Sequence, residues 1–143
     1  MGTDKGGMND PMTSVFAEFC ERFACWESAV AKLGPLSPAQ MRTVGVIGRN
    51  KNLRMKDIAE KMELTTGTVT VMVDRLQDMG FVERCRNESD RRSYKIVLSP
   101  KGERYFQEHV RRQESLVTKL TLGLKDDERR LLLNSLRRCI ASF

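Results

Sequence analysis

The sequence contains little of what a catalytic or metal-binding protein usually needs. It has one histidine, His109, and four cysteines without a Cys-x-x-Cys pair, so no ordinary zinc pattern is present. No spacing suggests a nucleophile beside a base, and no glycine-rich phosphate loop occurs. No run of 18 apolar residues could span a membrane. We therefore expect neither an enzyme nor a metal, cofactor or membrane partner.

A secretory signal is also lacking. The first ten residues are glycine-rich and polar, without the apolar stretch of an exported protein. The four cysteines, Cys20, Cys25, Cys85 and Cys139, are scattered in a way that fits reduced thiols. These features predict a cytoplasmic protein with a flexible N-terminus over residues 1–11.

Positive charge is what the sequence has in excess. The net charge is +6 and the isoelectric point is about 9.4, which makes nucleic acid the first candidate partner. A length of 143 residues suits one domain with appended oligomerisation helices. Charge alone is weak support, because many basic proteins never bind DNA.

Apolar spacing and capping residues predict the order of elements. They indicate helices over 13–33, 38–49, 55–62 and from Thr65 or Thr66 to Gly80, strands over 81–86 and 93–98, and helices over 100–122 and after Gly123. The predicted fold is mainly α with a small β-hairpin, a winged helix-turn-helix over 36–100. The flanking segments 12–35 and 101–143 form long amphipathic helices. Since these cannot bury their apolar stripes within one small domain, they predict a dimerisation region and a homodimer.

The fourth helix has the features of a recognition helix, which enters the major groove of DNA. Val69, Met72, Val73 and Leu76 point toward the core, whereas the outward N-terminal half is small and uncharged. Threonine hydroxyls and backbone N–H groups suit phosphate oxygens, Gly67 permits close approach, and Val71 suits thymine methyls. The residues expected to contact DNA here and at the start of the second helix are Ser37, Thr65, Thr66, Gly67, Thr68, Thr70, Val71 and Arg75. Taken alone, the threonines fit helix caps and solvated surface better than DNA contacts.

The hairpin favours the DNA-binding interpretation. Residues 84–95 carry a net charge of +3, residues 40–61 a net charge of +4, and the recognition helix a net charge of −1. Positive charge thus flanks the recognition helix, where phosphate and minor-groove contacts are made. The predicted contacts of the wing are Arg84, Arg86, Arg91, Arg92 and Lys95. One arginine at the turn suffices for the minor groove, and the other needs a partner within the protein.

The motifs resemble those of a known family. "LSPAQMRTVGVIGRN", "MKDIAEKMELTTGTVTVMVDRLQDMGFVER" and "DRRSYKIVLSPKG" are similar to the MarR family of transcription regulators. The resemblance implies a homodimer with intertwined terminal helices that binds a palindromic site on double-stranded DNA. It also implies that Arg92 pairs with Asp74 and braces the wing, while Arg91 enters the minor groove. The two roles could be exchanged, since sequence cannot orient adjacent side chains.

The resemblance further implies a repressor relieved by a small aromatic effector. Phe19, Arg22, Phe23 and Trp26 are the candidate effector-binding residues, although an aromatic stripe at helical spacing is more often dimer core. Because some members sense oxidants, Cys20 and Cys25 make a thiol-based redox sensor an alternative, against which buried structural cysteines are favoured. The rival from another class is a winged-helix protein–protein interaction module without DNA binding.

Overall fold

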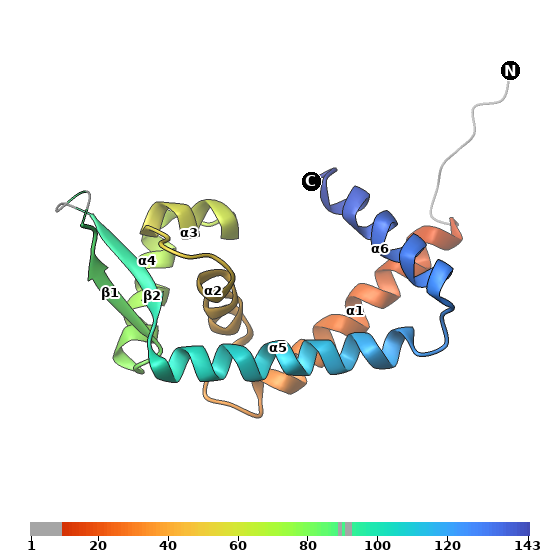
Figure 1. Cartoon of the computed structure of the whole chain (residues 1–143), viewed down its shortest axis with the longest axis horizontal. Coiled ribbons are helices and arrows are strands. Elements are labelled where there is room, and N and C mark those ends of the chain that lie inside the picture. The colour runs from red at the N-terminus through yellow and green to blue at the C-terminus, as the bar shows by residue number, and fades with distance from the viewer. Residues whose placement is uncertain (1–9, 89, 91–92) are drawn as a thin grey trace, which may run out of the picture. The chain divides into compact units, whose positions relative to one another are not determined.

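The chain is mainly helical, with one small β-hairpin in the part that the structure describes. The computed structural model describes residues 10–88, 90 and 93–143. The elements in this part of the chain are α1 (Pro11–Ala31), α2 (Pro38–Arg49), α3 (Met55–Met62), α4 (Thr66–Asp78), β1 (Val82–Arg86), β2 (Tyr94–Leu98), α5 (Pro100–Thr121) and α6 (Asp126–Ile140) (Figure 1). The predicted fold class is confirmed. Residues 1–9 of the predicted flexible N-terminus lie outside the described residues.

Caps fix the bounds of the helices around the hairpin. The Ser37 side chain accepts the N–H of Gln40, and the Gln40 side chain accepts the N–H of Ser37, which closes a capping box at α2. Thr65 caps α4 by accepting the N–H of Thr68. Gly80, with φ +77°, turns the chain out of α4, as glycine does at this position of a helix end. The predicted caps at Ser37, Thr65 and Gly80 are therefore confirmed.

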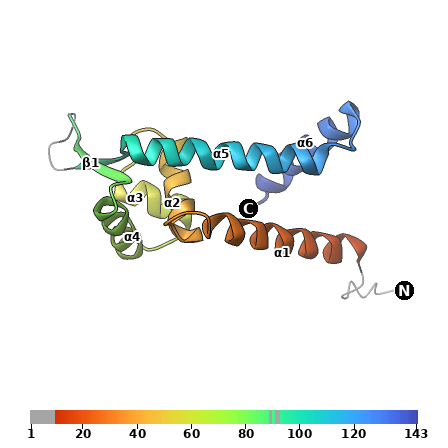
Figure 2. The same ribbon diagram turned by 90° about the horizontal axis from the view of Figure 1, so that it is seen from below.

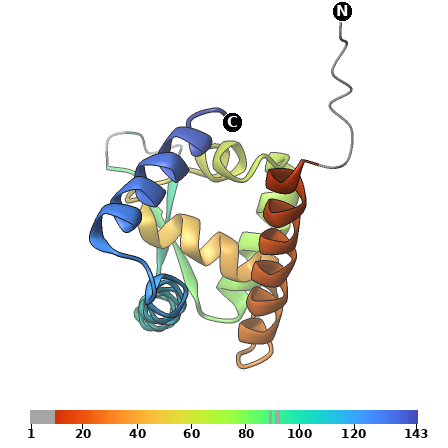
Figure 3. The same cartoon turned by 90° about the vertical axis from the view of Figure 1, so that its right-hand side faces the viewer.

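The core lies among α2, α3, α4 and the hairpin. Its largest fully buried side chains are Phe81, Leu36, Ile58, Leu76, Ile96, Val44, Val69, Val73, Val82 and Thr43. The loop before α3 joins the hairpin, because the N–H of Ile96 donates to the carbonyl of Leu53 at 2.7 Å. The helix-turn-helix and the wing are thus one packed body, from which α1 extends as a single helix (Figure 2). Residues 32–37 turn the end of α1 into α2 (Figure 3).

The chain divides into two compact units after Gly102. The first unit contains α1 to β2 and the first turn of α5, and the second contains the rest of α5 and all of α6. No residue of α6 is buried. Within the described residues no helix is both long enough and apolar enough to cross a membrane. The division into a DNA-binding domain over 36–100 and a dimerisation region stays a prediction.

Hydrogen bonds join the start of α5 to the start of the hairpin. The Ser99 N–H donates to the Phe81 carbonyl at 3.0 Å, and the Ser99 hydroxyl donates to the Gly80 carbonyl at 2.6 Å. A Cβ atom added to Gly102 would lie 2.0 Å from the Phe81 carbonyl oxygen. Lys101 donates to the Met79 carbonyl at 2.7 Å and lies over the Phe81 ring. The close approach of two backbones therefore requires glycine at position 102.

Candidate nucleic-acid interface

The N-terminal half of α4 exposes the threonines that the sequence singled out. Thr65 and Thr68 share a hydrogen bond between their hydroxyls at 2.9 Å, and Thr70 donates to the carbonyl of Thr66 at 2.8 Å. Because a hydroxyl oxygen has two lone pairs and one proton, these internal bonds leave capacity to accept but little capacity to donate. Thr66 is exposed, and its hydroxyl donates no hydrogen bond within the described residues. We expect Thr66 to be the best placed of the four to donate to a phosphate.

The outward face of α4 differs sharply from its inner face. Val69, Val73 and Leu76 are fully buried, as predicted, whereas the Val71 side chain is 54% exposed. Met72, which was expected in the core, is only half-buried. A Cβ atom added to Gly67 would meet nothing closer than the Thr65 hydroxyl at 4.0 Å. Gly67 is therefore not required for packing within the chain, and its value lies in keeping the surface open.

The register of the hairpin separates the basic residues of the wing. Arg84 lies opposite Ile96 and Arg86 lies opposite Tyr94, whereas Lys95 lies opposite Cys85. Because side chains alternate between the faces of a strand, Arg84 and Arg86 share the face of the buried Ile96. Lys95 points to the other face. Of the predicted wing contacts that the structure describes, Arg84 and Arg86 therefore lie on one face and Lys95 lies on the other.

Arg84 forms an ion pair with Asp74 of α4. Their side chains are 33% and 50% exposed, so the pair lies at the surface and joins the wing to the recognition helix. From the sequence, Arg84 was predicted to contact DNA, and Arg92 was predicted to pair with Asp74. Arg91 and Arg92 lie outside the described residues, so their assignment to the minor groove and to Asp74 stays a prediction. No local pattern in the sequence indicated the observed pair, because it joins β1 to α4.

A hollow of about 690 Å³ lies between α3, α4 and the hairpin. Thr66 and Thr70 line it from α4, and Arg84 lines it from β1. The other residues that line it are Arg54, Met55, Lys56, Ser93, Tyr94 and Ile96. Arg54 and Lys56 were counted among the flanking basic residues but not predicted as contacts. Three cationic side chains thus surround the hydroxyl-rich start of α4.

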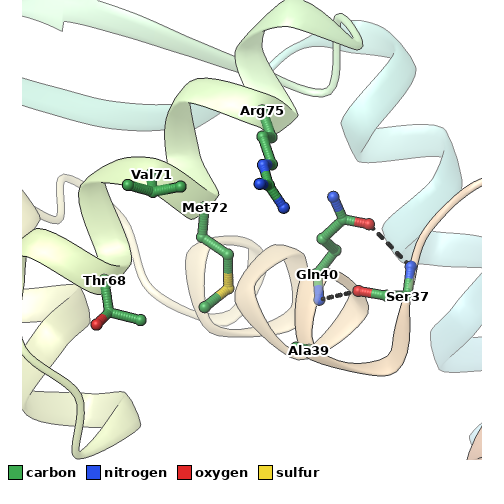
Figure 4. Close-up of a pocket in the computed structure, with 7 residues that line it drawn as sticks. All are labelled: Ser37, Ala39, Gln40, Thr68, Val71, Met72 and Arg75. Carbon is green, nitrogen blue, oxygen red and sulfur yellow. Dashed lines mark hydrogen bonds between the residues drawn. The ribbon is translucent and has the colours of Figure 1, made fainter.

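A second hollow, of about 570 Å³, lies on the other side of α4 against the start of α2. Its lining residues are Ser37, Ala39, Gln40, Thr68, Val71, Met72 and Arg75 (Figure 4). The structure thus brings together four of the predicted contacts, Ser37, Thr68, Val71 and Arg75. The exposed ridge of α4 lies between these two hollows, each of which is lined by apolar side chains as well as polar and cationic ones.

The first turn of α3 holds one perturbed carboxyl group. The Asp57 side chain accepts the backbone N–H of Arg54 at 2.7 Å, which satisfies a donor at the start of the helix. This hydrogen bond, together with the Arg54 guanidinium 3.5 Å away, lowers the pKa of Asp57. Part of the positive charge of Arg54 is therefore balanced within the protein.

The effector candidates form one row on α1. The ring centroids of Phe19 and Phe23 are 6.5 Å apart, and those of Phe23 and Trp26 are 5.6 Å apart. Arg22 is paired with Glu18 at 2.7 Å on the exposed surface. The role of these candidates in holding an effector stays a prediction.

The cysteines are not where the favoured interpretation placed them. Cys20, Cys25, Cys85 and Cys139 are all free thiols and all exposed in the single chain. The expectation of buried structural cysteines is wrong for the chain by itself, because α1 packs only its C-terminal end into the core. Among the described residues no cluster of three or more histidine, cysteine, aspartate or glutamate side chains could hold a metal ion.

A helix pair with an exposed, capped second helix and an adjoining hairpin defines a winged helix-turn-helix protein. Residues 36–94 match the model of the MarR family. Over these residues the chain is similar to the MarR family, and the resemblance inferred from its motifs is confirmed. The fold and the relatives are those of transcriptional regulators, so the expectation that the protein is not an enzyme is confirmed as well.

Relatives and solved structures agree on this assignment. The chain is 28% identical to the HTH-type transcriptional repressor MdtR of Bacillus subtilis over 65% of this chain and 60% of that protein. It is 34% identical to the HTH-type transcriptional regulator TtmR of Methylorubrum extorquens over 64% of this chain and 46% of that protein. The Streptococcus pneumoniae FabT structure in complex with DNA is 23% identical, with a TM-score of 0.83 over 91% of this chain and 93% of that chain. The chain thus spans about half the length of these curated relatives.

Proposed function

We propose that this protein is a homodimeric, sequence-specific DNA-binding transcriptional regulator that represses its targets. One observation carries the proposal. Hydroxyl groups at the start of α4 and cationic side chains from α3 and the hairpin line a single hollow. Arginine and lysine neutralise phosphate charge, and a helix start offers further donors, so this surface suits the backbone of a duplex. The FabT structure with DNA, which has the same fold, supports this placement.

Two copies of the recognition helix are needed for a palindromic site, and the chain has the surface for a homodimer. The large apolar side chains that α6 exposes are Leu131, Leu132, Leu133, Leu136 and Ile140. Three of them, Leu132, Leu133 and Leu136, also line a hollow of about 390 Å³ with Val117 of α5. Burial of such side chains against a second copy removes apolar surface from water and favours association. The recognition helices would then be held about 34–36 Å apart, one helical turn of DNA.

Regulation by a small aromatic molecule is the finer part of the proposal. The stacked rings of Phe19, Phe23 and Trp26 offer an aromatic surface on α1. Arg22 would have to exchange Glu18 for the carboxylate of an effector. Trp26 is the single tryptophan of the chain, so its fluorescence reports on this site without labelling. Saturable quenching by benzoate, lost in Phe23→Ala, would support an effector site, and a linear response would reject it.

The DNA-binding proposal is tested by fluorescence anisotropy with the duplex directly upstream of the protein's own coding region. A salt series should show steep weakening, since each neutralised phosphate contributes a slope of about −0.9 in log K against log salt. Lys56→Ala should reduce that slope by about one. Lys119→Ala on α5 removes the same charge outside the hollow and serves as the control. Weak binding to every duplex, with no effect of Lys56→Ala, would contradict the proposal.

Specificity is expected to rest on methyl contacts more than on bidentate hydrogen bonds, because the start of α4 has no arginine or asparagine. Val71→Ala should relax preference at one thymine position by about 1 kcal/mol, the lower end of a single mismatch. A series of duplexes with uracil in place of each thymine locates that position by removing one methyl at a time. Unchanged selectivity across the series would reject the methyl contact.

The rival function, a protein-interaction module, is less well supported. Such a module would present an apolar patch, yet Val71 is the one large apolar side chain exposed on α4 in the described residues. The hollow between α3, α4 and the hairpin is lined by the cationic side chains of Arg54, Lys56 and Arg84, which an apolar partner would have to remove from water.

A further inference from the structure

The recognition helix carries a methionine in an unusual position. Met72 lines the hollow of about 570 Å³ beside α2, and its side chain is half-buried. Figure 4 shows this side chain reaching from α4 toward α2, with Gln40 and Arg75 entering the same space. A space open to water is also open to small oxidants of similar size. The thioether of Met72 therefore belongs partly to the core and partly to the solvent-facing side of the interface.

A buried hydroxyl holds the sulfur in place. The Thr43 side chain of α2 has no exposed surface. Its hydroxyl lies 2.9 Å from the Ala39 carbonyl, 3.0 Å from the Met72 sulfur and 3.5 Å from the Met62 sulfur. The hydroxyl has one proton, which goes to the carbonyl as the stronger acceptor. The sulfur atoms of Met62, in α3, and of Met72, in α4, thus both contact the buried hydroxyl oxygen of Thr43.

This contact determines where an added oxygen would lie. At 3.0 Å there is no room for another atom between the Met72 sulfur and the Thr43 oxygen. An oxygen bonded to the sulfur must then point to the other side, into the hollow that Arg75 also lines. A sulfoxide oxygen is a polar acceptor, and a guanidinium in the same space is the charged donor able to satisfy it.

We propose that Met72 is a reversible oxidation site whose sulfoxide withdraws Arg75 from DNA. Hydrogen peroxide supplies the oxygen atom: its O–O bond breaks, an S–O bond forms at Met72, the sulfur gives up two electrons, and the leaving hydroxide takes the remaining proton and is released as water. The sulfoxide then accepts a hydrogen bond from Arg75, which no longer reaches the duplex. Methionine sulfoxide is returned to the thioether by the methionine sulfoxide reductases, which makes the modification reversible. The effect on DNA rests on the proposed function, whereas the modification itself does not.

The experiment compares the reduced protein with protein treated with hydrogen peroxide. Because the four thiols are exposed and oxidise as well, both samples are incubated with dithiothreitol, which reverses disulfides and sulfenic acids but not methionine sulfoxide. Peptide mass spectrometry then measures the gain of one oxygen atom at Met72. Met12, which is 71% exposed, provides the reference for an open methionine, and Met41, which is 6% exposed, provides the buried one.

DNA affinity is measured on the same samples and on two variants. Met72→Leu conserves volume without an oxidisable sulfur, and Met62→Leu is the matched control because it removes the other thioether at Thr43. We expect peroxide to weaken binding roughly tenfold in wild type and Met62→Leu, about the 1.4 kcal/mol of one arginine contact. After peroxide treatment, Met72→Leu should keep the DNA affinity that the same variant has before treatment. Methionine sulfoxide reductases should restore wild type, and Met72→Gln, with a fixed acceptor, should bind about tenfold more weakly without peroxide.

The possible results separate the two proposals. Oxygen added at Met12 but no more at Met72 than at Met41 would overturn the oxidation site. Oxygen at Met72 with equal loss of affinity in wild type and Met72→Leu would overturn its link to Arg75. If the untreated protein bound no duplex, the proposed function would fail, while the mass spectra would still decide whether Met72 is modified.

Discussion

Apolar residues are used in opposite ways in the helix-turn-helix with its wing and in α6. Ile58, Val73 and Leu76 have no exposed surface, whereas Leu131 of α6 is 68% exposed and none of the α6 residues is buried. Both regions have the periodicity of an amphipathic helix, and only one has something in the same chain to pack against. The first region is therefore stable through contacts of the single chain. The second contributes to stability only when another surface covers it.

The largest expected effect is the loss of the homodimer when the exposed apolar face of α6 is changed. Leu132→Glu with Leu136→Glu should abolish the homodimer, because full burial of one leucine contributes about 1.5–3 kcal/mol and four leucines change per dimer. Sedimentation velocity over a concentration series measures the change. Asn134→Glu adds one negative charge to α6, half that of the double substitution, without removing a leucine and should leave the dimer intact. A monomeric wild type, or a dimer that survives the double substitution, would contradict the prediction.

A smaller loss is expected from the buried side of the comparison. Leu76→Ala should lower the free energy of unfolding by about 2–5 kcal/mol, since the side chain is fully enclosed and the cavity cannot collapse completely. Urea denaturation followed by circular dichroism gives the value. Val71→Ala, on the exposed face of the same helix, should change it by less than about 0.5 kcal/mol. Similar losses for the two substitutions would mean that α4 packs differently from the structure.

The two faces of the wing allow a sharper test. Lys95→Ala should reduce the salt slope of DNA binding by about one, as removal of a phosphate contact does. Arg84→Ala should weaken binding without changing the slope, because Arg84 is already paired with Asp74 and acts by positioning the wing. The pair itself is partly exposed and should stabilise the fold by only about 0.2–1 kcal/mol. If the exchange Asp74→Arg with Arg84→Asp restored no affinity, the positioning role would be wrong.

The smallest effect concerns the pH dependence of stability. The pKa of Asp57 is lower in the folded protein than its ordinary value of 3.8, so its contribution is complete above that value. The contribution is lost as the pH falls through the folded-state pKa, where the carboxylate that caps α3 becomes protonated. Asp57→Ala should cost about 1 kcal/mol at pH 7 and less at pH 3. Thermal unfolding at several pH values tests this, and a constant difference would exclude the carboxylate as its source.

Much of the fold followed from local chemistry. Ser37 with Pro38, Thr65 and Gly80 determine helix ends through caps and backbone angles that depend on a few neighbouring residues, and the bounds of α2 and α3 came out as predicted. These features need no knowledge of distant parts of the chain.

The candidate site was less predictable, because its partners come from separate elements. The Arg84–Asp74 pair joins β1 to α4, and which face of a strand turns toward a helix depends on packing that no local pattern contains. Met72 was assigned to the core from helical periodicity, yet its position at the edge of that stripe opens it to a hollow formed with α2. Exposure of Cys20 depends likewise on how little of α1 packs into the first unit.

Position 102 illustrates a constraint on sequence variation. Any side chain there would place an atom on the Phe81 carbonyl, so twenty possible residues reduce to one without any contact to DNA, ligand or second copy. A random library at this codon should return only glycine among folded proteins. Strict invariance at such a residue therefore reflects chain geometry. If invariance among related sequences were taken as a sign of binding, position 102 would be assigned wrongly to the interface.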